Sequence, residues 1–288
     1  MLDEVVLIKE QYYILATSAL ADNRSQVLKY GETFAVLDRF GDIQPMGLGE
    51  QGIFHHGTRF LSRLLLRLGT GRPHLLSSRI REDNLLFTVD LCNVDMQLSG
   101  HALLPRGSVH VTRSKFLWRA TCYERFTFSN YSASDVELPL SLEIEGDFAD
   151  IFEVRGMKRA KRGERLPTVV DEDAVTLAYR GLDNTVRKTI IVCSLKPSDL
   201  TASRARFELT LRPKETVNLD VTIQCVEPAI VPTLAVSYEH GFAEACREPN
   251  LITSEATRVS TSNEEFDNWI RRSASDLQMM IAGNPEKC

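Results

Sequence analysis

The sequence predicts an all-β fold, a large antiparallel β-sandwich followed by a short C-terminal helical segment. Hydrophobic residues alternate with polar ones along many short segments, and Gly, Pro, Asp and Asn stand at the breaks between them. Apolar residues at helical spacing occur only near the end of the chain. Strict alternation is typical of strands that bury one face. Because no helical segments intervene between the strands, antiparallel sheets packed face to face are favoured over a parallel α/β fold.

The clearest predicted strands follow one another from residue 60 to residue 225. A charged turn, Arg81–Asn84, separates the first two, and a second turn, Arg212–Lys214, separates the last two. Along each strand every second residue is apolar, and these residues define the face that we expect to be buried. Its residues are Phe60, Leu64, Leu66 and Leu68; Leu85, Phe87, Val89 and Leu91; Val136, Leu138, Leu140, Leu142 and Ile144; Ala205, Phe207, Leu209 and Leu211; and Val217, Leu219, Val221, Ile223 and Cys225.

Two helices are predicted after the strands. Residues 237–247 are expected to form a short helix that Pro249 ends, and a longer helix is expected to begin at Ser262, which with Glu265 matches the S-x-x-E capping box. An amphipathic helix after an all-β region needs a partner to pack against. We therefore expect a β-sandwich domain over residues 1–250, and over residues 251–288 a linker and the first helix of a truncated second domain. The apolar stripe of this helix is Phe266, Trp269, Ile270, Leu277 and Ile281.

Composition and charge argue against several classes of protein. The formal net charge is −5, whereas binding to nucleic acid draws on a concentrated basic face. No apolar run approaches the ~20 residues that span a bilayer, and the acidic start lacks the features of a secretory signal. We expect a cytoplasmic chain that binds neither nucleic acid nor membrane, and whose six cysteines are buried thiols.

Two short motifs match cofactor or metal sites without the surrounding structure that such sites need. Gly47–Gly52 fits G-x-G-x-x-G, but no βαβ unit contains it, so a tight loop is expected. His55 and His56 are adjacent, and on an extended segment their side chains point to opposite faces, which places them badly for one metal ion. Contact of one of them with a ligand is the alternative. No cofactor and no metal ion are expected.

The most distinctive polar segment is Gly146–Gly156, which carries Asp147, Asp150 and Glu153. Glycoside hydrolysis needs two carboxyl groups across the scissile bond, but at this spacing these side chains can equally cap a turn or pair with Arg155. We expect sugar or interdomain contacts here rather than catalysis. The basic run that follows, residues 155–165, is predicted to be a solvated loop, with a contact surface for a partner domain or an anionic ligand as the alternative.

Several long motifs together resemble the amino-terminal domain of amylo-α-1,6-glucosidase-type glycogen-debranching enzymes. They are GETFAVLDRFGDI, GEQGIFHHGTRFLSRL, LLSSRIREDNLLFTVDL, RGSVHVTRSKFLW, YERFTFSNY and GDFADIFEVRGMKRAKRG, in the family's order and over nearly the whole chain. The resemblance implies a supersandwich-like β-domain that precedes an (α/α)-barrel carrying the glycosidase carboxylates. The segment FDNWIRRSASDLQMM is similar to the first helix of that barrel.

The resemblance also implies which residues face a ligand or the neighbouring domain. One position departs from it, because the family's loop often reads His-Arg-Asp-Thr-Arg, whereas here Gly57 replaces the acidic residue. A polar contact through that position is therefore in doubt. The candidates for substrate or interdomain contact are Arg59, Asp83, Asn84, Asp147, Asp150, Glu153 and Arg155, and those for domain docking are Phe266, Trp269 and Ile270.

Three functions follow as hypotheses. The leading one is a non-catalytic N-terminal domain of a debranching glycoside hydrolase, which braces the (α/α)-barrel of the same parent chain and helps to position an α-glucan. A stand-alone carbohydrate-binding module is the second, because exposed aromatic side chains stack on sugar faces. Its platforms would be Trp118, Tyr123 and Tyr131. The third is a mutarotase-like enzyme in which His110 and Glu124 exchange protons with the sugar.

Overall fold

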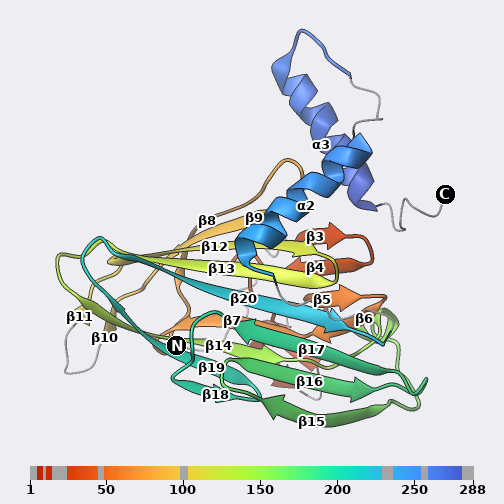
Figure 1. Cartoon of the computed structure of the whole chain (residues 1–288), viewed down its shortest axis with the longest axis horizontal. Coiled ribbons are helices and arrows are strands. Elements are labelled where there is room, and N and C mark those ends of the chain that lie inside the picture. Colours follow the sequence, from red (N-terminus) through yellow and green to blue (C-terminus); the bar gives the residue numbers. More distant parts are fainter. Residues whose placement is uncertain are drawn as a thin grey trace.

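A computed structural model of the chain describes residues 5–8, 11–14, 25–44, 49–97, 103–228, 236–253 and 259–280. Gly47 of the glycine motif and Ile281 of the helical stripe lie outside these residues. The largest element is an antiparallel eight-stranded sheet (Figure 1). In spatial order its strands are β15 (Glu164–Val170), β16 (Ala174–Arg180), β17 (Val186–Cys193), β20 (Thr216–Val226), β13 (Thr121–Asn130), β12 (Val109–Trp118), β9 (Phe87–Cys92) and β8 (His74–Ile80).

Two four-stranded antiparallel sheets complete the sandwich. One contains β18 (Asp199–Thr201), β19 (Arg204–Leu211), β14 (Val136–Glu145) and β7 (Arg63–Leu68). The other contains β3 (Gln26–Tyr30), β4 (Thr33–Leu37), β5 (Gly52–His55) and β6 (Thr58–Leu61). Two separate hairpins pair β1 (Val5–Ile8) with β2 (Gln11–Ile14), and β10 (Met96–Gln97) with β11 (Leu103–Leu104).

One hydrophobic core joins the three larger sheets. Phe126 from the eight-stranded sheet, Leu142 and Phe207 from β14 and β19, and Leu28 and Ile53 from β3 and β5 all belong to it and are almost completely buried. Within β14, buried and partly exposed residues alternate along the strand. The all-β antiparallel sandwich predicted from the alternation is therefore confirmed.

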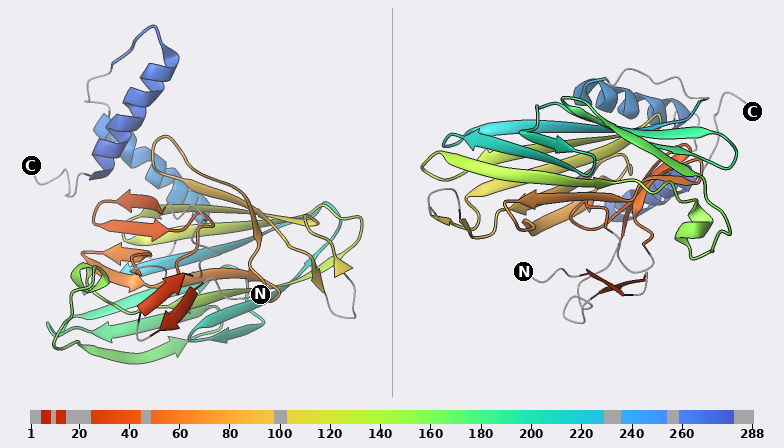
Figure 2. Two further views of the ribbon diagram at one scale, coloured as in Figure 1. Left: turned by 180° about the vertical axis from the view of Figure 1, so that it is seen from behind. Right: turned by 90° about the horizontal axis from the view of Figure 1, so that it is seen from below.

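The first of the two predicted helices, α2 (Tyr238–Thr253), lies across the outer face of the eight-stranded sheet (Figures 1 and 2). Phe242 packs edge-on against Phe116 of β12 with their ring centroids 5.3 Å apart, and Ala245 is completely buried in the same cluster. The prediction that Pro249 ends this helix is wrong, because the backbone remains helical to Thr253. A proline costs a helix interior about 3 kcal/mol, which weakens the helix without forbidding it.

The second predicted helix, α3 (Glu264–Met280), begins one residue later than a cap at Ser262 implies. The side-chain oxygen of Asn263, rather than that of Ser262, accepts hydrogen bonds from the amides of Glu265 and Phe266 at 3.0 and 3.2 Å. Asn caps a helix as well as Ser does, so the alignment of the first turn decides between them. None of the described helices is long and apolar enough to cross a membrane.

Candidate functional site

The acidic segment predicted from the sequence lies along the edge of β6. The amide of Arg59 donates to the carbonyl of Ala149 at 2.8 Å, and the amide of Ile151 donates to the carbonyl of Gly57 at 2.8 Å. The guanidinium of Arg59 makes a two-pronged ion pair with Asp147, with Nε 3.0 Å from Oδ1. Two sequence candidates that are 88 residues apart are thus brought together as one half-buried pair.

An aromatic stack anchors this segment to the core. Phe148 has a positive φ of 52°, which turns its ring inward, and the side chain is 4% exposed. Its ring lies parallel to that of Tyr179, with centroids 5.5 Å apart, and edge-on to that of Phe60 at 5.7 Å. The side chains of Asp147 and Asp150, which flank this anchored stretch in the chain, remain partly exposed.

The carboxylates of Asp150 and Glu153 are engaged by the cap of the short helix α1 (Ile151–Val154) and by Arg159 and Arg162. Asp150 accepts the amides of Phe152 and Glu153, and Glu153 accepts the amide of Asp150 at 3.0 Å, which forms a complete capping box. Burial alone would raise the pKa of Asp150, but the backbone amide of Glu153 and the guanidinium of Arg159 outweigh it, so this pKa is lowered. An ionised carboxylate held in this way is poorly suited to act as a general acid.

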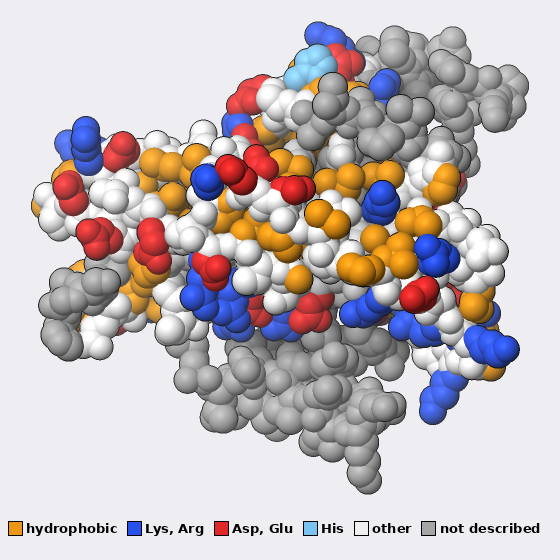
Figure 3. Space-filling view, turned by 60° about the horizontal axis from the view of Figure 1, so that its bottom comes forward, with side chains coloured by type: hydrophobic (Ala, Val, Ile, Leu, Met, Phe, Trp, Pro, Cys, Tyr) orange, Lys and Arg blue, Asp and Glu red, His pale blue; other side chains and the backbone are white. Residues whose placement is uncertain are grey.

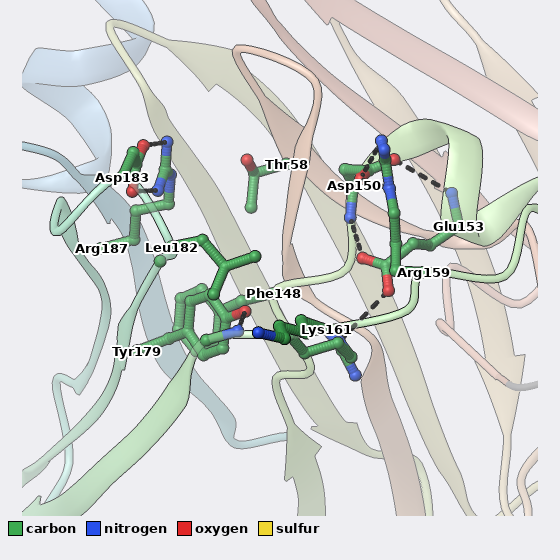
Figure 4. Close-up of a pocket in the computed structure, with 13 residues that line it drawn as sticks. Thr58, Phe148, Asp150, Glu153, Arg159, Lys161, Tyr179, Leu182, Asp183 and Arg187 are labelled. Carbon is green, nitrogen blue, oxygen red and sulfur yellow. Dashed lines mark hydrogen bonds and ion pairs between the residues drawn. The ribbon is translucent and has the colours of Figure 1, made fainter.

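A shallow pocket of about 290 Å³ opens beside α1 (Figure 4). Phe148 and Tyr179 lie at its base, with the acidic groups of α1 and their basic partners on one side and the Asp183–Arg187 pair on the other. Its cations slightly outnumber its carboxylates. The lining residues are Thr58, Phe148, Asp150, Glu153, Arg159, Lys161, Arg162, Gly163, Tyr179, Gly181, Leu182, Asp183 and Arg187.

The other candidates from the sequence lie elsewhere. Asp83 pairs with Arg81 in the turn between β8 and β9. Asn84, which is 5% exposed, donates from Nδ2 to Asp276 Oδ1 of α3 at 2.6 Å. Arg155 forms the C-cap of α1 and is exposed. The candidates therefore divide into a group at α1 and two residues of the β8–β9 turn, of which Asn84 bonds to α3 and Asp83 to Arg81 of the turn itself.

Two of the three expected sugar platforms are unavailable for stacking. Trp118 and Tyr123 are 5% and 3% exposed, because α2 covers them. Only Tyr131, at 71% exposure, presents its ring to solvent among the three. The sequence indicated their strands but gave no sign that a later helix would cover this face.

The proton-exchanging pair expected for a mutarotase-like enzyme is not formed. His110 pairs with Ser129 across the β12–β13 ladder, whereas Glu124 pairs with Lys115, five residues further along β12. Since five is odd, the two side chains project from opposite faces of the sheet. Glu124 is completely buried, while the side chain of His110 is 29% exposed and lies 3.5 Å from Asp90. The hypothesis that these two residues share a site is therefore excluded by their positions on the sheet.

Glu124 instead belongs to a buried charge network that the sequence analysis missed. Arg113 Nε donates to Glu124 at 2.8 Å, and Lys115 Nζ lies 3.1 Å from the same carboxylate. Both cations also donate to the carbonyl of Gly41, at 3.0 and 2.8 Å. Gly41 has a φ of +80°, and a Cβ there would lie 3.4 Å from the Arg113 guanidinium. That separation is an ordinary van der Waals contact, so the left-handed backbone, which favours glycine, is what restricts this position.

The network continues through two aspartates of the loop after β4. Oδ1 of Asp42 accepts a hydrogen bond from Arg113 Nη1, and Oδ2 accepts one from Arg72 Nη2 at 2.9 Å. Burial alone would raise the pKa of Asp42, but Arg113 and Arg72 outweigh it and lower this pKa. Burial dominates at Asp38, whose pKa is raised although it too pairs with Arg72. Three carboxylates and three cations thus balance in this network, and all of them except Arg72 are buried.

A signal for this network was present in the sequence. In the segment 109–117 every second residue lies on the same face of the strand. This face contains Val109, Val111, Arg113, Lys115 and Leu117. Extending the alternation through the charges places both cations on the buried face, where each requires an anionic partner. The partners come from residues 42 and 124, which no spacing rule connects.

The two adjacent histidines also differ from the expected arrangement. His56 has a φ of +45° at the turn between β5 and β6, so strand alternation ends at His55. The two rings lie 4.0 Å apart between centroids. Nδ1 of His56 is 3.1 Å from Glu227, which follows β20. Burial, together with the neighbouring His56, lowers the pKa of His55 to about 4.

The fold and the site define an all-β sandwich domain whose conspicuous carboxylates are engaged in internal ion pairs and caps. A sequence model of the N-terminal domain of some glycogen debranching enzymes matches residues 28–222. The chain therefore belongs to this family of N-terminal domains. No curated protein sequence matches it significantly.

The solved structures that match the chain are distant from it in sequence. A putative kojibiose phosphorylase from the human microbiome is 9% identical with a TM-score of 0.49, over 87% of this chain and 35% of that one. A putative aldose 1-epimerase from Escherichia coli K12 is 8% identical with a TM-score of 0.41, over 71% of this chain and 99% of that one. The chain thus spans about a third of the length of the kojibiose phosphorylase.

Proposed function

We propose that this chain is the non-catalytic N-terminal domain of an amylo-α-1,6-glucosidase-type debranching glycoside hydrolase, and that it braces the (α/α)-barrel catalytic domain of the parent protein. The observation that carries the proposal is an exposed apolar stripe on α3 in a chain of this family. Phe266, Trp269 and Leu277 are 43%, 67% and 66% exposed. Large apolar side chains clustered on one surface are typical of an interface.

The sandwich holds α3 in place for such docking. Asn84 donates to Asp276 of α3, and Arg272 of α3 donates to the carbonyl of Arg81 at 3.2 Å. These bonds use polar side chains of the helix and leave the aromatic ones exposed, with the rings of Phe266 and Trp269 5.8 Å apart. The candidates Asn84 and Trp269 thus have complementary roles, one fixing the helix and the other meeting the barrel.

The engaged state of the carboxylates supports a non-catalytic role. A glycosidase needs one carboxyl group that gives up a proton and one that stays free to act as base or nucleophile. Asp147 is held by Arg59, and both Asp150 and Glu153 are committed to the cap of α1 and to Arg159 and Arg162. The pocket beside them offers charged and hydroxyl groups for hydrogen bonds to an α-glucan or to a loop of the barrel.

Nucleic-acid binding is not supported by the described part of the face in Figure 3, because it carries charges of both signs rather than one concentrated basic patch. Acidic and basic side chains are interspersed with hydrophobic ones on the coloured part of the face in Figure 3. A stand-alone carbohydrate-binding module is less well supported, since Tyr131 is the one exposed ring of the three expected platforms. We place the protein in the cytoplasm on the basis of its sequence.

The docking proposal is tested with the separately expressed (α/α)-barrel of a debranching enzyme of this family. We expect the barrel to bind the chain, and Phe266→Ser combined with Trp269→Ser to weaken binding roughly 30-fold, since buried aromatic anchors contribute about 2 kcal/mol or more. Leu103→Ser is the matched control, because Leu103 is 64% exposed on β11. Isothermal titration measures both affinities.

Two results would contradict the proposal. Equal binding by the double variant and the control would remove α3 as the docking surface. Hydrolysis of α-1,6-linked oligosaccharides by this chain alone, measured as release of reducing sugar, would show that the domain is catalytic. Titration with maltooligosaccharides in the same series tests whether the pocket beside α1 contributes to glucan binding.

A further inference from the structure

The turn between β5 and β6 brings two imidazoles and a carboxylate together. It is a two-residue turn with φ values of +45° at His56 and +74° at Gly57. Positive φ values at both positions are typical of the tight turns that join antiparallel strands. The reversal of the chain at His56 places its ring beside that of His55 instead of on the opposite face of the strand.

Glu227 completes the cluster from the other side of the sandwich. It follows the last residue of β20 in the eight-stranded sheet, whereas the histidines lie in a four-stranded sheet. One nitrogen or oxygen atom from each of the three residues lies within 4.8 Å of the other two. Nδ1 of His56 is 3.1 Å from Oε2 of Glu227. Two ligands held about 2.0–2.1 Å from a tetrahedral ion lie roughly 3.3 Å apart, so this separation suits a shared ion.

An unpartnered atom on His55 points independently to a ligand. The residue is 6% exposed, and its Nε2 has no hydrogen-bond partner among the described residues. Its Nδ1 lies 2.7 Å from the hydroxyl oxygen of Thr33. When Nδ1–H donates to that hydroxyl, the lone pair of the ring is on Nε2. A metal-binding histidine is typically oriented in this way by a second hydrogen bond, and a buried polar atom without a partner requires an explanation.

The surroundings allow a cation despite a nearby arginine. Arg187 donates to Oε1 of Glu227 at 3.1 Å, and Asp183 makes two hydrogen bonds to the same guanidinium. The charge of Arg187 is thus balanced, and Oε2 of Glu227 remains for the ion. The side chain of His56 is 48% exposed, which gives the ion access from solvent.

We propose that His55, His56 and Glu227 bind a divalent transition-metal ion, for which Zn²⁺ is the best match. Two imidazoles and one carboxylate are a ligand set that Zn²⁺ accepts, with water completing its coordination. The proton that His56 shares with Glu227 leaves to solvent when the ion binds. The ion ties the β5–β6 hairpin to the end of β20 and so joins two sheets. The site lies next to the pocket beside α1, because Thr58, which follows the turn, and Arg187, which binds Glu227, both line that pocket. This inference does not depend on the proposed function.

The test is titration of the chelator-treated chain with ZnCl₂. Wild-type protein is expected to bind one ion per chain. His56→Asn is expected to weaken binding by at least about tenfold, since even the loss of a residue behind the ligands costs about 10- to 100-fold. Asn followed by Gly favours this turn, so the variant keeps the hairpin. Glu227→Gln is a second variant, with the same expected loss.

His74→Asn is the matched control, because His74 is an exposed histidine that faces Arg106, outside the cluster. It is expected to bind Zn²⁺ as the wild type does. Zn²⁺ should also raise the unfolding temperature of the wild type and of this control, but not that of His56→Asn. The proposal is overturned if wild-type protein shows no saturable binding in the micromolar range. It is equally overturned if His56→Asn and Glu227→Gln both retain wild-type affinity.

Discussion

The buried charge network and the charged segment at α1 use the same residue types for opposite purposes. In the core, the side chains of Arg113 and Glu124 are 1% and 0% exposed, and every charge has an opposite partner. At α1, the side chains of Asp150 and Arg159 are 34% and 42% exposed. A buried charge that loses its partner is costly, whereas an exposed pair contributes about 0–1 kcal/mol. The position of the charges, rather than their chemistry, decides which group is structural.

The position of the charges also decides where a ligand can bind. The loop at residues 38–42 closes the core network, in which Arg113, Lys115 and Glu124 are at most 1% exposed, and the network holds that loop against β12 and β13. The α1 segment borders an open pocket, and its ion pairs can exchange for contacts to a ligand at little cost. Carboxylates at the surface are therefore the ones that a ligand or a partner can reach.

The largest expected effect is from Arg113→Met. This substitution leaves Asp42 and Glu124 with fewer cations in the core, and we expect a loss of about 3–5 kcal/mol in the free energy of unfolding, measured by urea titration. The matched surface change, Arg159→Met, is expected to alter it by less than about 1 kcal/mol. Similar losses for the two would remove the distinction between the regions.

A second variant separates charge imbalance from lost packing. Adding Glu124→Gln to Arg113→Met restores the balance of charges, since two carboxylates and two cations then remain. The double variant is expected to be more stable than Arg113→Met alone. A double variant that is less stable than the single one would indicate that hydrogen bonds, not charge, dominate the network.

Asp42→Asn is expected to have the next largest effect, and one that depends on pH. Because Arg113 and Arg72 hold the pKa of Asp42 below its ordinary value of 3.8, the stability that its charge contributes is present above that value and is lost as the pH falls through the folded-state pKa. We expect the variant to be less stable by about 1.5–3 kcal/mol at neutral pH. Urea titrations at decreasing pH should show this difference shrinking below about pH 4; a constant difference would exclude the ionic origin.

Asp150→Ala is expected to have the smallest effect of the three. It removes the cap of α1 and one partner of Arg159, which costs about 0.5–2 kcal/mol. Amide hydrogen exchange at Phe152 and Glu153 should increase, since both amides lose their acceptor. Unchanged exchange there would mean that packing alone holds α1 in place.

The sequence by itself determined the class of fold and the position of most strands. Alternation depends on neighbours two residues apart, so it can be read from Val136 to Ile144 without knowledge of any other strand. The long motifs likewise indicated the family, which the match over residues 28–222 confirms. The capping of α3 was predicted one residue too early, because Ser262 and Asn263 are both good caps and only the geometry of the turn distinguishes them.

Only the tertiary structure decided which side chains are reachable and which meet. Trp118 and Tyr123 are covered by a helix more than a hundred residues later in the chain, and Arg113 is enclosed by a loop from the opposite sheet. His55, His56 and Glu227 converge through one turn and the end of a distant strand. Periodicity reports which face of a strand is apolar, but coverage and convergence depend on segments far away in sequence, and these are fixed only when the sheets pack together.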